Sequence, residues 1–155
     1  MSHTKKSAII SLVICALSGV ILVVWLFTFP QFFNWFYTVY HELGSEYQET
    51  HRIIKLVIPT FYACAPFAGI AIYVLIRLLL NIINETVFVR TNVKYLRWIS
   101  YLCYAVMLIT VATGIFYVPL LIIGFGTGVV GTLLRVVKNL METAVEIKNE
   151  NDMTI

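Results

Sequence analysis

Thirty-seven consecutive residues without a formal charge, WISYLCYAVMLITVATGIFYVPLLIIGFGTGVVGTLL at positions 98–134, decide the fold of this chain. As one α-helix this stretch would be roughly 55 Å long, nearly twice the ~30 Å hydrocarbon thickness of a membrane. The chain must therefore turn back. Gly114, Phe116, Tyr117 and Pro119 mark the turn, because glycine loosens a helix, aromatic rings favour the interface and proline suits a first helical turn. The stretch predicts two spans, at 98–115 and 119–137, joined by a tight hairpin.

Two further apolar runs precede it. Residues 7–29 carry no charge and are long enough to cross the membrane, and we interpret them as a retained anchor because the run exceeds a signal peptide's apolar region. A second span is expected at 54–80, with a bend where Pro59 and Pro66 each free a carbonyl. The predicted fold is an all-α integral membrane protein, a four-transmembrane-helix bundle forming a single membrane domain over residues 1–155.

The composition agrees with this fold class. Of the 155 residues, 60% are hydrophobic and 12% are charged, and the mean hydropathy is +0.88. A soluble domain has roughly a quarter of its residues charged. The formal net charge is +3, but the Lys and Arg residues lie between long uncharged runs rather than in a patch. Direct nucleic-acid binding is therefore not expected.

The Lys and Arg residues predict the orientation in the membrane. Cytoplasmic loops carry the excess of these residues, and placing both termini in the cytoplasm puts nine of them inside and two outside. This gives an outer loop at 30–53, an inner loop at 81–97 and a cytoplasmic tail at 138–155, a helix extension of the fourth span. The nine are Lys5, Lys6, Arg77, Arg90, Lys94, Arg97, Arg135, Lys138 and Lys148, and the two are Arg52 and Lys55.

The fourth span contains Gly126-x-Gly128-x-x-Gly131, the glycine spacing of a dinucleotide-binding loop. Such a loop needs a preceding strand and water-facing amide groups, and here the glycines lie in the middle of a span. On an ideal helix, Gly124, Gly128 and Gly131 fall within about 60° of each other. They predict a small-residue face for close packing against the third helix or against a second copy in a homo-oligomer.

The same face continues beyond the membrane. If the helix runs unbroken, Arg135, Glu142 and Glu146 project onto the glycine face, which then leads into a charged cytoplasmic face. The alternative is a solvated helix end on which Lys138 and Glu142 form an ordinary i,i+4 pair.

Little in the sequence indicates catalysis. The span centres contain no Asp, Glu, Lys or Arg, the residues that proton relays, ion-coupled carriers and intramembrane catalysts require. The three cysteines lie in apolar runs, and the three histidines are scattered without metal-ligand spacing. We expect no enzymatic activity, no cofactor and no metal site.

Between the first two spans, QFFNWFYTVYHEL at 31–43 is dense in aromatic residues, with Trp35, Phe36 and Tyr40 among them. This density predicts a short segment lying in the outer interface. It is either a plain interfacial anchor or a platform that senses an extracellular peptide or lipid.

The inner loop places Arg90, Lys94 and Arg97 at i, i+4 and i+7, with Thr91 or Asn92 expected to cap the third span. The cations either snorkel to the interface and fix the orientation or form half of a docking surface.

Two signatures resemble the bacterial membrane family catalogued as domain of unknown function 2975. One is Asn92-Val93-Lys94-x-Leu96-Arg97-x-Ile99, and the other is the ending Glu150-Asn151-Asp152-Met153-Thr154-Ile155. The chain has Val87-Phe88 where the family often has Pro-Phe. Family members are frequently encoded beside a small helix-turn-helix regulator of the phage-repressor type, so the resemblance implies a bacterial inner-membrane protein with such a cytoplasmic partner.

We therefore expect a non-enzymatic membrane regulator that senses a membrane or extracellular condition and holds a cytoplasmic partner. Two alternatives are an immunity or envelope-stress protein that binds antimicrobial peptides at the outer aromatic segment, and a small channel or transporter subunit. The candidate docking residues are Asn92, Lys94, Leu96, Arg97, Glu146, Asn151, Asp152, Thr154 and Ile155.

Overall fold

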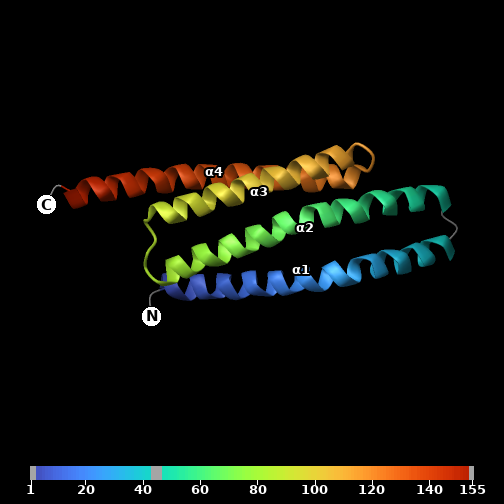
Figure 1. Cartoon of the computed structure of the whole chain (residues 1–155), viewed down its shortest axis with the longest axis horizontal. Coiled ribbons are helices and arrows are strands. Elements are labelled where there is room, and N and C mark those ends of the chain that lie inside the picture. The colour runs from blue at the N-terminus through green and yellow to red at the C-terminus, as the bar shows by residue number, and fades with distance from the viewer. Residues whose placement is uncertain (1–2, 43–46, 154–155) are drawn as a thin grey trace.

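The structure, a computed structural model, describes the backbone of residues 3–42 and 47–153, and the side chains of these residues apart from 3–4, 37, 40–42 and 47–51. Each helix in this part of the chain is long and apolar enough to cross a membrane, and no β-strand occurs there. The predicted all-α, multi-pass membrane fold is confirmed. The helices are α1 (His3–Glu42), α2 (Tyr47–Ile83), α3 (Arg90–Gly114) and α4 (Val118–Met153) (Figure 1).

Helix α1 runs well past the expected end of the first span at residue 29. Pro30 lies inside the helix and removes one backbone donor. The ring of Phe29 lies 5.6 Å from Trp25 and 4.8 Å from Phe33, centroid to centroid, so aromatic packing continues across the proline. The expected outer loop at 30–53 is instead mostly helical, and its aromatic segment prolongs α1 rather than forming a separate helix.

The connection between α2 and α3 is also shorter than expected. Of the predicted inner loop at 81–97, only residues 84–89 lie outside the helices. The end of α2 is closed by two backbone hydrogen bonds, from Thr86 N–H to Asn81 O at 3.0 Å and from Glu85 N–H to Ile82 O at 3.1 Å. Glu85 has a φ of 62°, the left-handed conformation at which a helix usually ends with glycine.

The turn between α3 and α4 lies where the sequence predicts it. Helix α3 ends at Gly114, and α4 begins at Val118. The turn is closed by hydrogen bonds from Phe116 N–H to Thr113 O at 3.1 Å and from Tyr117 N–H to Gly114 O at 3.2 Å. The α3–α4 pair is therefore a hairpin.

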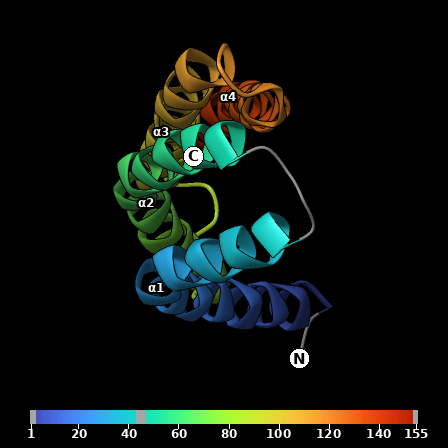
Figure 2. The ribbon, with the colours of Figure 1, turned by 90° about the vertical axis from the view of Figure 1, so that its right-hand side faces the viewer.

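The four helices form an open arc. Among the described residues, each helix contacts only its neighbours in the sequence, and the contact between α3 and α4 is the most extensive. Viewed along the helices, α1 and α4 stand apart at the two ends of the arc (Figure 2). The N- and C-terminal ends of the described chain lie at the same end of the molecule (Figure 1).

Glycine explains the close contact between α3 and α4. Gly124, Gly128 and Gly131 are all buried. A methyl group at Gly124 would lie 2.7 Å from Thr110 Oγ1, and one at Gly131 would lie 3.1 Å from Cys103 Cβ. The two helix backbones therefore approach closely on this face, whereas a methyl group at Gly126 would meet nothing within 4 Å.

Candidate functional site

Most of the positive charge lies at one end of the molecule, which we call the basic end. It comprises the start of α1, the end of α2, the 84–89 loop, the start of α3 and the part of α4 from Arg135 onward (Figure 1). All nine cations that the sequence assigns to the cytoplasm belong to these parts, while Arg52 and Lys55 lie near the start of α2 at the other end. The fold thus gathers the charges that are scattered in the sequence.

Asn92 holds the joint between α2 and α3 and is fully buried, with 0% of its surface exposed. Its Nδ2 donates to the carbonyl oxygens of Thr86 and Val87, both at 2.8 Å, and its Oδ1 accepts from Asn81 Nδ2 at 2.7 Å. One side chain thereby satisfies two loop carbonyls and fixes the loop on the end of α2. A buried amide with these partners is a structural clamp.

The structure corrects two expectations about this segment. The N-cap of α3 is Val89, without a side-chain cap hydrogen bond, so neither Thr91 nor Asn92 caps the helix as predicted. Asn92 instead reaches back to the loop, in the direction in which helix side chains lean. Asn92 and Leu96, both expected as docking residues, are buried, so their side chains are not accessible to a partner.

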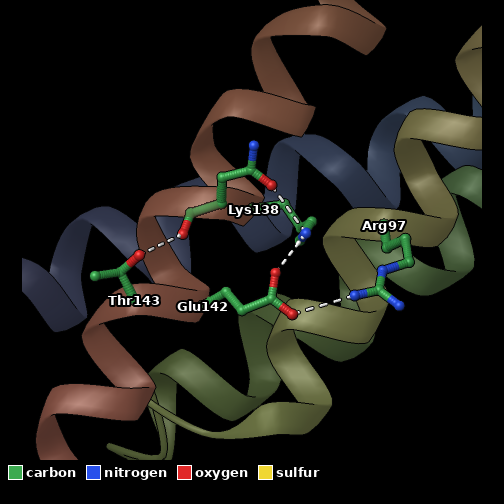
Figure 3. Close-up of polar contacts among 5 residues, drawn as sticks. Arg97, Lys138, Glu142 and Thr143 are labelled. Atoms are coloured by element: carbon green, nitrogen blue, oxygen red, sulfur yellow. Dashed lines mark hydrogen bonds and ion pairs between the residues drawn. The ribbon is translucent and has the colours of Figure 1, made fainter.

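Arg97, Lys138 and Glu142 join α3 to α4 at the basic end (Figure 3). Arg97 Nη2 lies 3.2 Å from Glu142 Oε1, and Lys138 Nζ lies 2.5 Å from Glu142 Oε2. The hydrogen bond from Lys138, together with the charges of Lys138 and Arg97, holds the pKa of Glu142 below its ordinary value. The expected i,i+4 pair between Lys138 and Glu142 is thus present, and Arg97 extends it across the helices.

A cavity of about 240 Å³ lies between the charged ends of α3 and α4. It brings together three of the predicted docking residues, Lys94, Arg97 and Glu146. Arg90 and Glu142 also line it, so its wall is basic on the α3 side and acidic on the α4 side. Such a wall can bind polar or charged groups of either sign.

A wider groove of about 450 Å³ lies farther along α4, against the 84–89 loop. Asn151 and Asp152 line it, whereas Thr154 and Ile155 lie outside the described residues. Phe88 and Ile147 supply its apolar surface. Sequence analysis missed these two, although the spacing of Leu140, Ala144, Ile147 and Asn151 along one helix face is a detectable signal.

The 84–89 loop is also tied to α1. Lys5 Nζ lies 2.6 Å from Glu85 Oε1, and the hydrogen bond from Lys5 is the main reason that the pKa of Glu85 is lowered. Both side chains are exposed, so this ion pair is weak. It connects the first helix to the loop that carries Phe88.

The aromatic residues form a second cluster at the opposite end. Phe29 of α1 stacks on Phe61 of α2 with ring centroids 4.0 Å apart and an interplanar angle of 18°. Trp35 and Phe36 continue the cluster along α1 and are exposed, while the side chain of Tyr40 lies outside the described residues. The cluster can anchor α1 or present aromatic rings outward.

In the described part of the chain, no group of three or more His, Cys, Asp or Glu side chains lies close enough together to hold a metal ion. The polar contacts at the basic end are ion pairs and hydrogen bonds between side chains and loop carbonyls. Such contacts can bind a partner or ligand and hold the helices and the loop in position.

Comparison with known proteins identifies a family. The family described as "Protein of unknown function (DUF2975)" matches residues 38–155, well over half of the chain and including the loop, α3 and α4. No curated protein and no solved structure matches the chain.

Proposed function

Since the chain belongs to the DUF2975 family, whose function is unknown, we propose that it is a non-enzymatic regulator of the bacterial inner membrane. In this proposal the basic end lies in the cytoplasm and holds a soluble protein partner. The helices sense a membrane or extracellular condition and change how firmly the partner is held.

The distribution of charge supports the orientation. The basic end holds nine Lys and Arg residues against two at the other end. Lys and Arg near the ends of spans are retained in the cytoplasm during insertion. Both termini would then be cytoplasmic.

The observation that carries the proposal is the open groove between the 84–89 loop and α4. Its apolar residues, Phe88 and Ile147, are 49% and 54% exposed. Phe88 belongs to the loop and Ile147 to α4, and the charged residues Lys148 and Asp152 of α4 line the groove beside them. Apolar side chains kept exposed in water between polar rims are typical of protein interaction sites.

The shape and charge of the groove favour one kind of occupant. Leu140, Ala144, Ile147 and Asn151 repeat along one face of α4, the pattern that accepts an amphipathic helix. From residue 138 to residue 152 this segment has four carboxylates, at 142, 146, 150 and 152, against lysines at 138 and 148. The expected occupant is a helix of a soluble protein with basic residues at its edge. The helix-turn-helix regulator that the resemblance implies is the first candidate, because DNA-binding proteins are basic.

The joint between the helix pairs supplies a route for the signal. Phe88 belongs to the loop that links α2 to α3, and Ile147 belongs to α4. A change in how the α1–α2 pair sits against the hairpin would move one wall of the groove relative to the other. The grip on the partner would change with it.

We would test the proposal with tagged full chains purified from native membranes in mild detergent. Companion proteins are identified by mass spectrometry, and their binding is then repeated pairwise with purified components. Replacing Phe88 and Ile147 with Asp, or deleting residues 149–155, should remove a soluble companion that the unaltered chain retains.

Asn149→Ala is the matched control. Asn149 is exposed on the same segment but about 200° around the helix from Ile147, so this variant should keep the companion. If all four forms retain the same proteins in the same amounts, the groove is not a docking site.

A further inference from the structure

Three cations meet at the border between the apolar and charged parts of the hairpin. Arg97 of α3 with Arg135 and Lys138 of α4 line a small cavity together with Ser100 and Tyr101. The guanidinium carbon of Arg135 lies 5.8 Å from the centre of the Tyr101 ring, within range of a cation–π contact. Two helices therefore present their positive charge at one point.

This cluster keeps surplus charge. Within the described residues, Glu142 is the carboxylate within ion-pair distance of Arg97 and Lys138, and none lies within that distance of Arg135. Three cations and one carboxylate leave two positive charges. An anion would therefore be attracted here more strongly than a neutral group.

The size of the cavity restricts the ligand. Its volume is about 30 Å³, room for about two water molecules. A whole metabolite cannot be enclosed there. One oxygen of a phosphate can enter, with the rest of the ligand lying along the surface.

The position of the cluster suits a lipid. Sequence between Trp98 and Leu134 has no formal charge, so Arg97 and Arg135 flank the apolar part of the hairpin at the same end. Trp98 and Tyr101 are exposed beside them. Aromatic rings with a polar edge favour the level of lipid head groups.

A second, apolar groove lies on the hairpin deeper in the span. It has a volume of about 350 Å³ and is lined by Tyr104 and Met107 of α3 and by Phe125, Val129 and Leu133 of α4, among others. Tyr104 is seven residues from Arg97, so the two lie on one face of α3. Gly128, also in this groove, is seven residues from Arg135 on α4. A charged site and an apolar groove therefore share one side of the hairpin.

We propose that Arg97, Arg135 and Lys138 bind the phosphate of an anionic phospholipid, with one acyl chain lying in the groove beside Tyr104 and Met107. Ser100 and Tyr101 line the head-group cavity. This site is separate from the protein-docking groove of the proposed function, because it lies on the membrane side of Glu142.

Native mass spectrometry of the purified full chain tests the proposal. The chain is kept in neutral detergent with an equal mixture of phosphatidylglycerol and phosphatidylcholine. Wild type should retain phosphatidylglycerol preferentially. Arg135→Gln should weaken this binding about fivefold, the effect of one cation at a membrane surface. Arg135→Lys, which keeps the charge, should bind within about twofold of wild type, since the charge supplies most of the attraction.

Lys148→Gln is the matched control, since Lys148 is an exposed cation farther along α4 and should not alter lipid binding. Equal retention of both lipids by wild type would overturn the proposal without any variant, as would equal phosphatidylglycerol binding by wild type and folded Arg135→Gln. In a competition experiment, the bound lipid is challenged with inorganic phosphate or with a short phosphatidylglycerol that has six-carbon acyl chains. If both displace the lipid at the same concentration, the site binds free phosphate and the lipid assignment is overturned.

Discussion

The α3–α4 hairpin and the α1–α2 pair hold together by different means. In the hairpin, buried glycines bring the backbones close, and Ser100 Oγ donates to the carbonyl oxygen of Gly131 at 2.8 Å. In the α1–α2 pair, a methyl group at Gly19 would lie 3.5 Å from its nearest neighbour, an ordinary contact. Aromatic rings, such as the stacked pair of Phe29 and Phe61, fill the space instead.

This difference has a physical reason. Lipid tails are as apolar as leucine, so burying apolar surface between membrane helices gains little, and close backbone packing and hydrogen bonds decide stability. Helix α1 has few buried side chains, whereas α3 and α4 bury polar groups and glycines against each other. We infer that the hairpin is the rigid half and that the α1–α2 pair is the half that adjusts.

The largest effect is expected from Gly124→Val, which would break the hairpin itself. A Cβ at Gly124 would lie 2.7 Å from Thr110 Oγ1 and 3.3 Å from the backbone nitrogen of Val111, so the helices must separate. We expect a loss of about 3 kcal/mol in the free energy of unfolding, at the upper end for overpacking. Reversible unfolding in mixed SDS micelles, followed by circular dichroism, measures it.

Gly126→Val is the control, because a Cβ at this position would meet nothing within 4 Å and so would not touch α3. If both variants are equally stable, close packing at Gly124 does not hold the hairpin together.

The second effect concerns the joint between the two pairs. Asn92→Ala leaves the carbonyls of Thr86 and Val87 and the amide of Asn81 without their partner, at a cost of about 2 kcal/mol. The same micelle experiment should show the loss, and hydrogen exchange should rise in residues 84–89. Asn84→Ala, a change at an exposed amide of the same loop, should alter neither.

The third effect tests the α1–α2 pair. Phe29→Ala removes the ring stacked on Phe61 and should cost about 1 kcal/mol, the aromatic pair energy, because lipid or neighbouring chains replace the lost apolar contact. Phe27→Ala, at a side chain that is 75% exposed, should have almost no effect. A cost of 3 kcal/mol or more at Phe29, the value typical of a water-soluble core, would contradict the comparison.

The fourth effect concerns the loop that ties α1 to the hairpin. Glu85→Gly and Glu85→Ala both remove the ion pair with Lys5, but only glycine adopts the φ of 62° without strain. We expect the glycine variant to be more stable than the alanine variant by about 1 kcal/mol. Equal unfolding free energies of the two variants would show that this end of α2 does not keep its left-handed residue.

The smallest effect is pH-dependent and concerns the charged end of the hairpin. The pKa of Glu142 is lowered in the folded chain by Lys138 and Arg97, so its ion pairs stabilise the fold at pH 7. This contribution should be lost as the pH falls through the folded-state pKa, which lies below the ordinary pKa of a glutamate. Glu142→Gln should lose less thermal stability than wild type between pH 7 and pH 3.5.

Because Glu85 titrates in both proteins and its pKa is lowered as well, the difference between wild type and Glu142→Gln isolates Glu142. Parallel pH profiles for the two proteins would show that these ion pairs do not stabilise the hairpin.

The sequence alone predicts the fold class and the hairpin. The uncharged stretch at 98–134 exceeds the membrane thickness, and apolar runs as long as those of the spans are typical of membrane-crossing helices. The pair of Lys138 and Glu142 follows from i,i+4 spacing. All these inferences depend on local composition and helical geometry, which the order of residues determines.

The tertiary structure decides the rest, because it depends on contacts between distant residues. Sequence spacing cannot show that Asn92 turns inward to bind Thr86 and Val87, or that aromatic packing carries α1 past Pro30. Nor can it place Arg97 beside Glu142, 45 positions away. The packing of α3 on α4 brings these side chains together, and the grooves at the basic end exist only as a consequence of that packing.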